Sequence, residues 1–105
     1  MVTLDANPAV LHCTGDEDRT TQSLRRTALS RALAVDEDLM VDFTGLGFAD
    51  TSLMLDLAMV AGRVRAAGFT TRLRGATPQI ERLIETVGLD RIDGVELLRT
   101  PTGTS

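Results

Sequence analysis

The chain has 105 residues, the usual size of one folded domain, and leaves little room for a second. Apolar residues make up 43% and charged residues 25%, so one packed core is expected. The net charge of −4 opposes contact with nucleic acid or anionic lipid. With three Phe and no Tyr or Trp, the chain also lacks aromatic platforms for stacking bases. We therefore expect no nucleic-acid partner.

The single cysteine and the N-terminal residues indicate a cytoplasmic protein. One Cys cannot form an internal disulfide, which fits a reducing compartment. Residues 1–5 lack the basic and apolar regions of a signal peptide, and no run reaches the roughly 18 apolar residues of a membrane span. The sequence thus predicts a cytoplasmic location without direct membrane insertion.

The first half of the chain predicts a strand hairpin followed by a helix. Alternating apolar residues indicate strands over 2–6 and 9–14, with a turn at Asn7 and Pro8 between them. An acidic loop over 16–18 follows. Apolar residues at helical spacing then predict a helix over 21–35, whose opposite, solvent-facing side carries Arg25, Arg26 and Arg31.

The second half alternates strands and helices. Strands are expected over 39–43, 69–74 and, at the sheet edge, 95–98; Val41 and Phe43 belong to the central one. A long helix should cover 51–67, with Leu57 on its buried side. Thr77 and Pro78 open another helix, which Gly88 closes.

This element order predicts an α/β fold with a mixed, mostly parallel sheet of four or five strands, flanked by about three or four helices. One domain should span residues 1–99, and residues 100–105 are expected to form a disordered tail.

Enzyme chemistry finds little support in the residue patterns. His12 and Cys13 are neighbours in a predicted strand, so their side chains should point to opposite faces and cannot form a nucleophile–base pair. The acidic runs lack the spacing of a calcium loop, and Gly45 and Gly47 lack the rest of a dinucleotide fingerprint. We expect no catalytic residue, no metal and no cofactor.

Asp50, Thr51 and Ser52 stand at the start of the most apolar predicted helix. Residues of these types cap helices, and capping alone accounts for all three. A hydroxyl at a helix N-terminus is also well placed to become a phosphate, because the free amides and the helix dipole stabilise the added charge. The residue types alone leave both interpretations open.

Residues 39–52, LMVDFTGLGFADTS, resemble the hallmark of STAS domains, the anti-sigma-factor antagonist family: an apolar strand, a short turn, then Asp-Ser-Ser-Gly opening a helix. Gly15-Asp-Glu-Asp18 is similar to the family's Gly-Glu-Leu-Asp element. Ala66-Ala-Gly68, Thr77-Pro-Gln-Ile80 and Val87-Gly-Leu-Asp90 are similar to the family's ending.

The resemblance implies a STAS-like fold and a regulator that docks onto an anti-sigma factor with serine/threonine kinase activity, which binds the ATP. The kinase would phosphorylate Thr51, with Ser52 beside it, and so end docking. The implied partner-binding residues are Asp16, Asp18, Asp50, Thr51, Ser52, Leu53, Met54 and Asp56.

Leu53 stands where the family usually has Gly, and we expect its side chain to add bulk where a kinase approaches. Some relatives, such as the STAS subunit of a phospholipid-trafficking ABC transporter, carry Asp-Thr at this place and serve as scaffolds. A scaffold subunit of a transporter or another signalling complex, without phosphorylation, is therefore the alternative. The sequence leaves a homodimer open.

Overall fold

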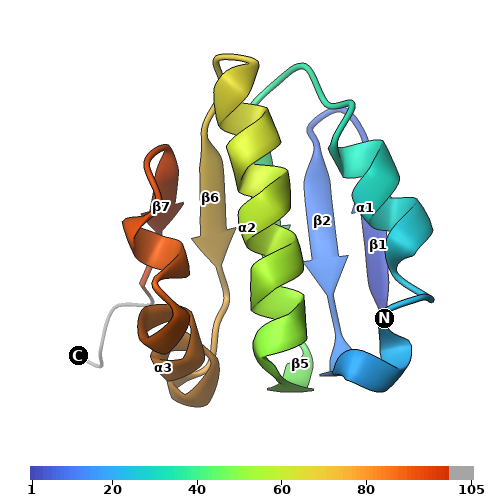
Figure 1. Cartoon of the computed structure of the whole chain (residues 1–105), viewed down its shortest axis with the longest axis vertical. Coiled ribbons are helices and arrows are strands. Elements are labelled where there is room, and N and C mark those ends of the chain that lie inside the picture. The colour runs from blue at the N-terminus through green and yellow to red at the C-terminus, as the bar shows by residue number, and fades with distance from the viewer. Residues whose placement is uncertain (100–105) are drawn as a thin grey trace.

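The computed structural model describes residues 1–99, which form a five-stranded sheet covered on one face by helices (Figure 1). The strand order is β1-β2-β4-β6-β7, and a separate two-stranded sheet pairs β3 with β5. The strands are β1 (Val2–Asp5), β2 (Val10–Cys13), β3 (Gly15–Glu17), β4 (Leu39–Asp42), β5 (Leu46–Ala49), β6 (Thr71–Arg74) and β7 (Val95–Leu97). The helices are α1 (Arg26–Ala32), α2 (Thr51–Ala66) and α3 (Pro78–Val87), with 3₁₀ turns η1 (Arg19–Thr21) and η2 (Leu89–Arg91). The expected disordered tail lies outside the described residues.

The pairing of the main sheet confirms the predicted mixed, mostly parallel arrangement. β1 and β2 form an antiparallel hairpin, in which Val2 lies opposite Cys13. β2, β4, β6 and β7 then pair in parallel, and β7 is the predicted edge strand. Strands that alternate with helices in the chain require crossover connections, which place the helices on a face of the sheet.

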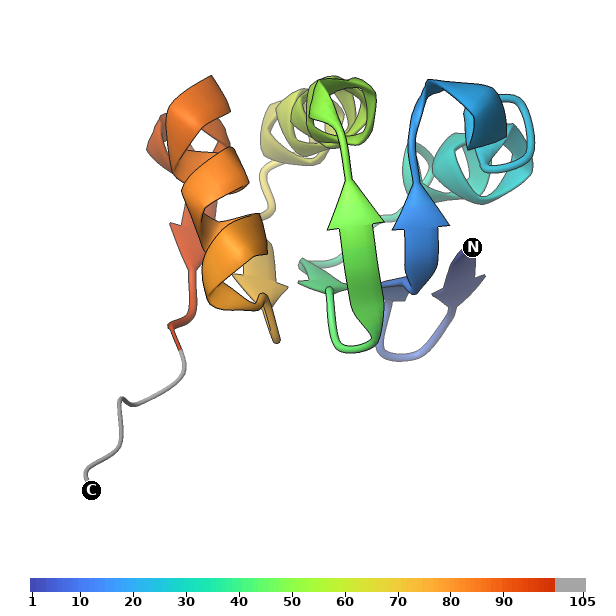
Figure 2. The same cartoon turned by 90° about the horizontal axis from the view of Figure 1, so that it is seen from below.

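All three helices lie on the same face of the sheet, as the view from below shows (Figure 2). The core fills the space between them. Val41 and Phe43 on the central strand are buried, as is Leu57 on α2, so the predicted packing of α2 on the sheet is confirmed. Alternate residues of each strand point away from the helices, and we call this side of the sheet the open face.

The third helix begins and ends at the predicted residues. The Thr77 hydroxyl accepts a hydrogen bond from the Ile80 N–H at 3.3 Å, and Pro78 occupies the first turn. Gly88 ends the helix with φ +81°, a left-handed conformation that glycine adopts without strain. Leu89 follows it into the core.

Two local predictions were wrong. The helix expected over 21–35 is split: η1 comes first, and α1 covers only Arg26–Ala32. The acidic segment expected to be a loop instead contributes β3, which pairs in parallel with β5. This small sheet runs from the sheet layer towards the helix layer, at the end of the molecule where α2 begins (Figure 2). It thereby brings residues 15–17 beside the start of α2.

Candidate functional site

The candidate site is the end of the molecule where β3, η1 and the start of α2 meet. The Asp50 N–H donates to the Glu17 carbonyl at 3.1 Å, and the Arg19 N–H donates to the Asp50 carboxylate at 3.1 Å. These two bonds join segments more than 30 residues apart in the chain. Asp16, Asp18 and Asp50, the acidic residues implied for docking, therefore lie at one end of the fold.

Asp50 is the N-cap of α2, so the capping interpretation is confirmed for Asp50, whereas Thr51 and Ser52 are the first two residues of the helix. Its carboxylate accepts the Ser52 N–H at 2.9 Å and the Ser52 hydroxyl at 2.5 Å. The hydrogen bond from the Ser52 side chain is the main cause that lowers the pKa of Asp50 below its ordinary value. Asp50 is therefore a carboxylate at neutral pH, next to any group added at the helix start.

The two hydroxyls that follow Asp50 have different surroundings. Thr51 is exposed at the first position of α2, and within residues 1–99 its hydroxyl has no hydrogen-bond partner. Ser52 is half-buried; its hydroxyl donates to Asp50 and accepts a bond from Arg25 Nη2 at 3.1 Å. Of these two hydroxyls, Thr51 is therefore the one that is accessible and without a partner among the described residues.

Arg25 is the residue that sequence reasoning misplaced. It was expected on the solvent side of a helix, but its side chain is 1% exposed. Its Nε donates to Asp56 at 2.9 Å, and its Nη1 donates to Glu17 at 3.2 Å. Nη1 also donates to the Asp18 carbonyl at 3.1 Å. One buried guanidinium thus ties together β3, the segment before α1 and the first turns of α2.

Glu17 is the second buried charge of this network. Besides Arg25, its carboxylate accepts the Met1 amino group at 2.6 Å and the Thr21 hydroxyl at 3.2 Å. A buried carboxylate needs several such partners to remain charged. The sequence contains a sign of this buried charge, because Glu17 stands where the family's Gly-Glu-Leu-Asp element has a leucine. A charge at a core-facing position predicts an opposite charge nearby.

Asp16 and Asp18 border the site on its outer side. Asp16 is exposed. Asp18 caps η1 by accepting the Thr20 N–H at 2.8 Å and the Thr20 hydroxyl at 2.5 Å. The hydrogen bond from the Thr20 side chain is the main cause that lowers the pKa of Asp18. Together with Asp50, these carboxylates place three acidic side chains at the end of the molecule where α2 begins.

The structure corrects two of the implied docking residues. Leu53 and Met54 are both 0% exposed and pack in the core, so their side chains do not lie on a surface that a partner can touch. The expectation that Leu53 adds bulk in front of a kinase is wrong for the same reason. Asp56 is partly exposed but held by Arg25. The large apolar side chains that α2 does expose are Leu55 and Met59.

The arrangement of His12 and Cys13 agrees with the predicted strand geometry. Cys13 is buried beneath the helices, and burial is the main cause that raises the pKa of its thiol to about 12. His12 lies on the open face, where Nε2 is 3.1 Å from Asp5 and Nδ1 is 3.7 Å from Asp42. The two side chains do not form a nucleophile–base pair.

Within the described residues, no group of three or more His, Cys, Asp or Glu side chains could hold a metal ion. None of the helices in residues 1–99 is long and apolar enough to cross a membrane.

A sheet with helices on one face and a capped, acidic end at α2 is a small α/β domain of the kind the sequence resemblance implied. A model of the family described as "Mlab, STAS domain" matches residues 1–99. The chain therefore belongs to the STAS domain family. Among curated proteins, none matches it significantly.

Solved structures share the fold. The anti-sigma factor antagonist SpoIIAA in its unphosphorylated form superposes with a TM-score of 0.74 at 17% identity, over 94% of this chain and 89% of that one. An anti-sigma-factor antagonist (STAS) domain protein from Planctomyces limnophilus superposes with a TM-score of 0.66 at 14% identity, over 95% of this chain and 90% of that one. The Bacillus cell fate determinant SpoIIAA in the phosphorylated form superposes with a TM-score of 0.60 at 22% identity, over 94% of this chain and 92% of that one. The predicted fold class is confirmed.

Proposed function

We propose that this STAS domain is a regulatory module that docks onto a protein partner through the end formed by β3, η1 and the start of α2. The observation that carries the proposal is the difference between the two hydroxyls at that end. Thr51 is exposed and free, whereas Ser52 is held by Asp50 and Arg25. Asp16, Asp18 and Asp50 lie at the same end of the fold and belong to the proposed docking surface.

Phosphorylation of Thr51 is the proposed switch. A phosphate adds about −1.5 to −2 charges at pH 7. The amides at the start of α2 favour that charge, but the neighbouring carboxylates of Asp18 and Asp50 repel it. A partner that covers this surface must remove water from the phosphate, and an unpaired buried charge costs several kcal/mol. Docking should therefore weaken by orders of magnitude.

The proposed partner is an anti-sigma factor that is also a serine/threonine kinase and carries the ATP. Support comes from the shared fold with SpoIIAA, which is described as an anti-sigma factor antagonist and is known in a phosphorylated form. In this role the chain itself is not an enzyme, needs no cofactor and acts in the cytoplasm. By occupying the kinase it would release a sigma factor and so regulate transcription.

A second candidate function is a scaffold subunit of a transporter or another signalling complex, in which Thr51 is never phosphorylated. The observation that favours it is the description of the matching family, which names Mlab rather than a sigma-factor regulator. The same end of the molecule would then hold a permanent contact.

The test is partner capture from the native host with the wild-type chain, Thr51→Ala and Thr51→Glu. We expect wild type and Thr51→Ala to retain an ATP-binding kinase and Thr51→Glu to lose it. Thr27→Glu, which adds the same charge at another exposed helix position, is the matched control and should retain it. Retention of the partner by Thr51→Glu would contradict the switch. Recovery of transporter subunits by all variants would establish the scaffold role.

A further inference from the structure

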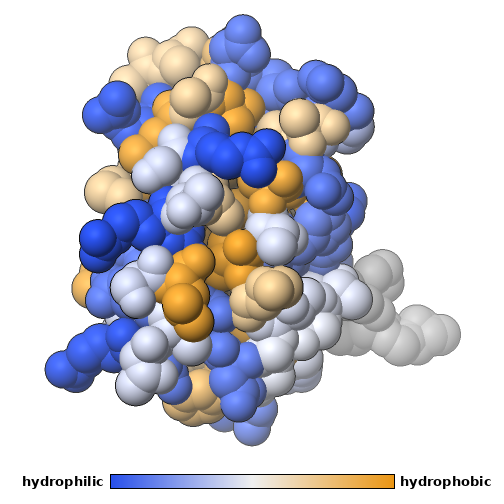
Figure 3. Space-filling model, turned by 90° about the vertical axis from the view of Figure 1, so that its right-hand side faces the viewer, coloured by the Kyte–Doolittle hydropathy of each residue, from blue (hydrophilic) through white to orange (hydrophobic). Residues whose placement is uncertain are grey.

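A groove runs between α1 and α2 on the outer surface of the helix layer. It is lined by Gln22, Arg26, Leu29, Leu33, Asp56 and Met59. The two helices lie side by side in front of the sheet (Figure 1). On the side of the molecule that includes α1, apolar and strongly hydrophilic side chains lie next to each other on the surface (Figure 3). The groove is separate from Thr51, which stands at the start of α2.

Two large apolar side chains of α2 are exposed to water on this surface. Met59 is 52% exposed and Leu55 is 64% exposed. They are four residues apart on α2 and therefore lie one above the other on the same side. Leu29 and Leu33 of the opposite wall lie deeper. Leu55 and Met59 therefore form a short exposed apolar strip on α2 beside the groove.

The charge of the groove is opposite to that of the chain. Arg26 lines it, and Arg63 lies one turn beyond Met59 on the same side of α2. Both are exposed, and neither forms an ion pair within residues 1–99. Asp56 is the acidic residue of the lining, and Arg25 Nε already binds it at 2.9 Å. Two uncompensated cations thus flank an apolar strip in a chain of net charge −4.

We infer that this groove binds an acidic amphipathic helix of a partner protein. Apolar residues spaced i, i+3, i+4 and i+7 on that helix would contact Met59, Leu55 and the leucines of α1, as in other helix-in-groove complexes. Its carboxylates would pair with Arg26 and Arg63. The 16 residues of α2 span about 24 Å, enough for four turns of a partner helix. The inference does not depend on the phosphorylation of Thr51.

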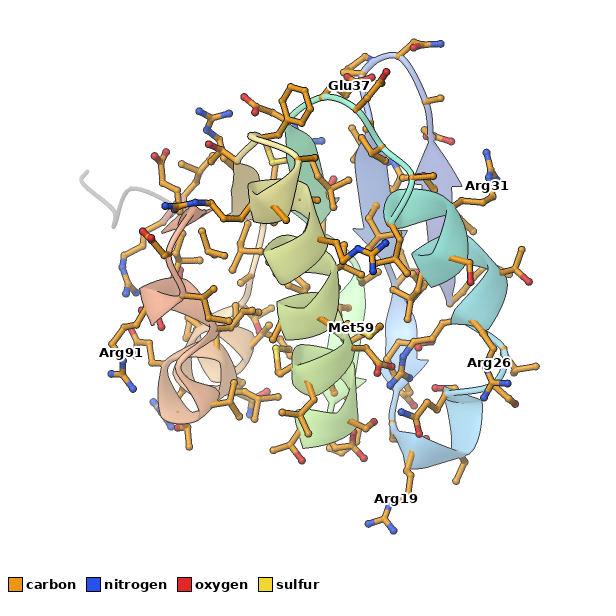
Figure 4. All side chains as sticks on the ribbon, turned by 45° about the horizontal axis from the view of Figure 1, so that its top comes forward. Arg19, Arg26, Arg31, Glu37, Met59 and Arg91 are labelled. Atoms are coloured by element: carbon orange, nitrogen blue, oxygen red, sulfur yellow. The ribbon has the colours of Figure 1, made fainter. Side chains whose placement is uncertain are left out.

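A protein helix fits this surface better than a lipid surface. Electrostatic attraction to anionic lipid contributes only about 1 kcal/mol per basic residue and is used by clusters of four to eight. Only two unpaired arginines are available, Arg26 in the groove and Arg63 beside it, and the hollow shape suits a rod rather than a plane. Figure 4 shows Arg26 and Met59 on their neighbouring helices, while Arg31 points away from α2.

The test uses the full chain with ¹³C-labelled methionine methyl groups. The probe is a synthetic 18-residue helix with leucines at the spacing above and glutamates on its remaining faces. The control peptide keeps the leucines and replaces each glutamate with lysine. Met59 stands in the groove, Met54 in the core, Met40 on the open face, and Met1 at the N-terminus. We expect only the Met59 methyl signal to shift, in a saturable way, and only with the acidic peptide.

Charge-reversal variants locate the binding. Arg26→Glu combined with Arg63→Glu should weaken binding of the acidic peptide about tenfold or more. The reason is that two attractive charge pairs become repulsive. Arg31→Glu combined with Arg91→Glu makes the same net charge change at exposed arginines outside the groove and should alter affinity less than about threefold. Equal binding of both peptides, equal effects of both variant pairs, or an unmoved Met59 methyl would overturn the inference. So would a Met59 shift caused by phosphatidylglycerol vesicles or by raising the protein concentration alone.

Discussion

Two groups of charged residues in this domain differ in how they are held. Beneath the candidate site, Arg25 is buried and bonded to Glu17, Asp56 and Ser52. On the open face of the sheet, the largely buried Asp42 lies between His12 and Arg74, whose side chains are 35% and 46% exposed. Arg74 Nη2 is 3.2 Å from the Asp42 carboxylate. Similar side chains thus surround a buried cation in one place, and in the other a carboxylate is paired with partly exposed side chains.

The difference shows which charged side chains hold neighbouring residues in place. A buried charge that loses its partner cannot be compensated by water, so every member of the Arg25 network is needed. On the open face, water reaches His12 and Arg74 and screens their pairs with Asp42, so each pair contributes less. Because the network holds Ser52 inward, it also leaves Thr51 as the free hydroxyl. The open face has no comparable influence on the site.

Removal of Arg25 should have the largest effect. Arg25→Met leaves Glu17 and Asp56 without their shared cation, and breaking a buried pair in this way costs about 3–5 kcal/mol. Urea denaturation measures the loss of unfolding free energy. In contrast, Glu17→Leu combined with Arg25→Leu removes both buried charges and should recover most of it. A loss below about 1 kcal/mol in Arg25→Met would contradict the comparison.

The orientation of α2 decides which hydroxyl faces the network, and two leucines on α2 test it. Leu57 is buried against the sheet, so Leu57→Ala should lower the free energy of unfolding by about 2–5 kcal/mol. Leu55→Ala is the matched control on the exposed side and should change it by less than about 0.5 kcal/mol. Similar losses for both variants would mean that α2 is rotated from the orientation described.

Loss of the α2 cap should have an intermediate effect. Asp50→Ala removes the acceptor of the Ser52 N–H and should cost about 1 kcal/mol in denaturant melts. Asp50→Asn retains a capping oxygen and should lose less. An unchanged stability in Asp50→Ala would show that the bonds to Ser52 and Arg19 do not hold the helix start.

Acid should weaken the capped end in a defined range of pH. The pKa values of Asp18 and Asp50 are lowered in the folded state, chiefly by hydrogen bonds from Thr20 and Ser52. A lowered folded pKa stabilises the fold above the unfolded pKa of about 3.9, and this stability is lost as pH falls below that value. Unfolding free energy measured between pH 6 and 2 should decline at the acidic end, and less steeply in Asp50→Asn.

The smallest effect is expected on the open face. Arg74→Ala removes one ion pair of Asp42. The Asp42 carboxylate still accepts the hydrogen bond from the Thr44 N–H at 2.9 Å. The unfolding free energy should fall by less than about 1 kcal/mol, and added salt should reduce the difference further. A loss comparable with that of Arg25→Met would erase the distinction between the two regions.

Sequence patterns predicted the elements that local signals determine. Alternation, capping residues and glycines were enough for the hairpin, the parallel strands, α2 and α3. The split of the first predicted helix and the pairing of β3 with β5 were missed, because both depend on contacts between segments distant in the chain. Arg25 was predicted on the solvent-facing side of a helix because arginine side chains are usually exposed. Only its partners Glu17 and Asp56, from two other elements, make its burial possible.

The candidate site was predicted in outline and corrected in detail. Asp50, Thr51 and Ser52 lie at the helix start as expected, and Asp16 and Asp18 are close by. Leu53 and Met54 were assigned to the docking surface from their place beside Thr51 in the chain. A helix turns by about 100° per residue, so neighbours in sequence point in different directions, and these two point into the core.

The central claim is that Thr51 is the free hydroxyl of a switch and that Arg25 keeps Ser52 out of reach. Its most direct test is incubation of the chain with the captured kinase and ATP, followed by fragmentation mass spectrometry that separates Thr51 from Ser52. We predict phosphate on Thr51 and none on Ser52 in the wild-type chain. Phosphate on Ser52 instead, or none on either residue, would contradict the claim.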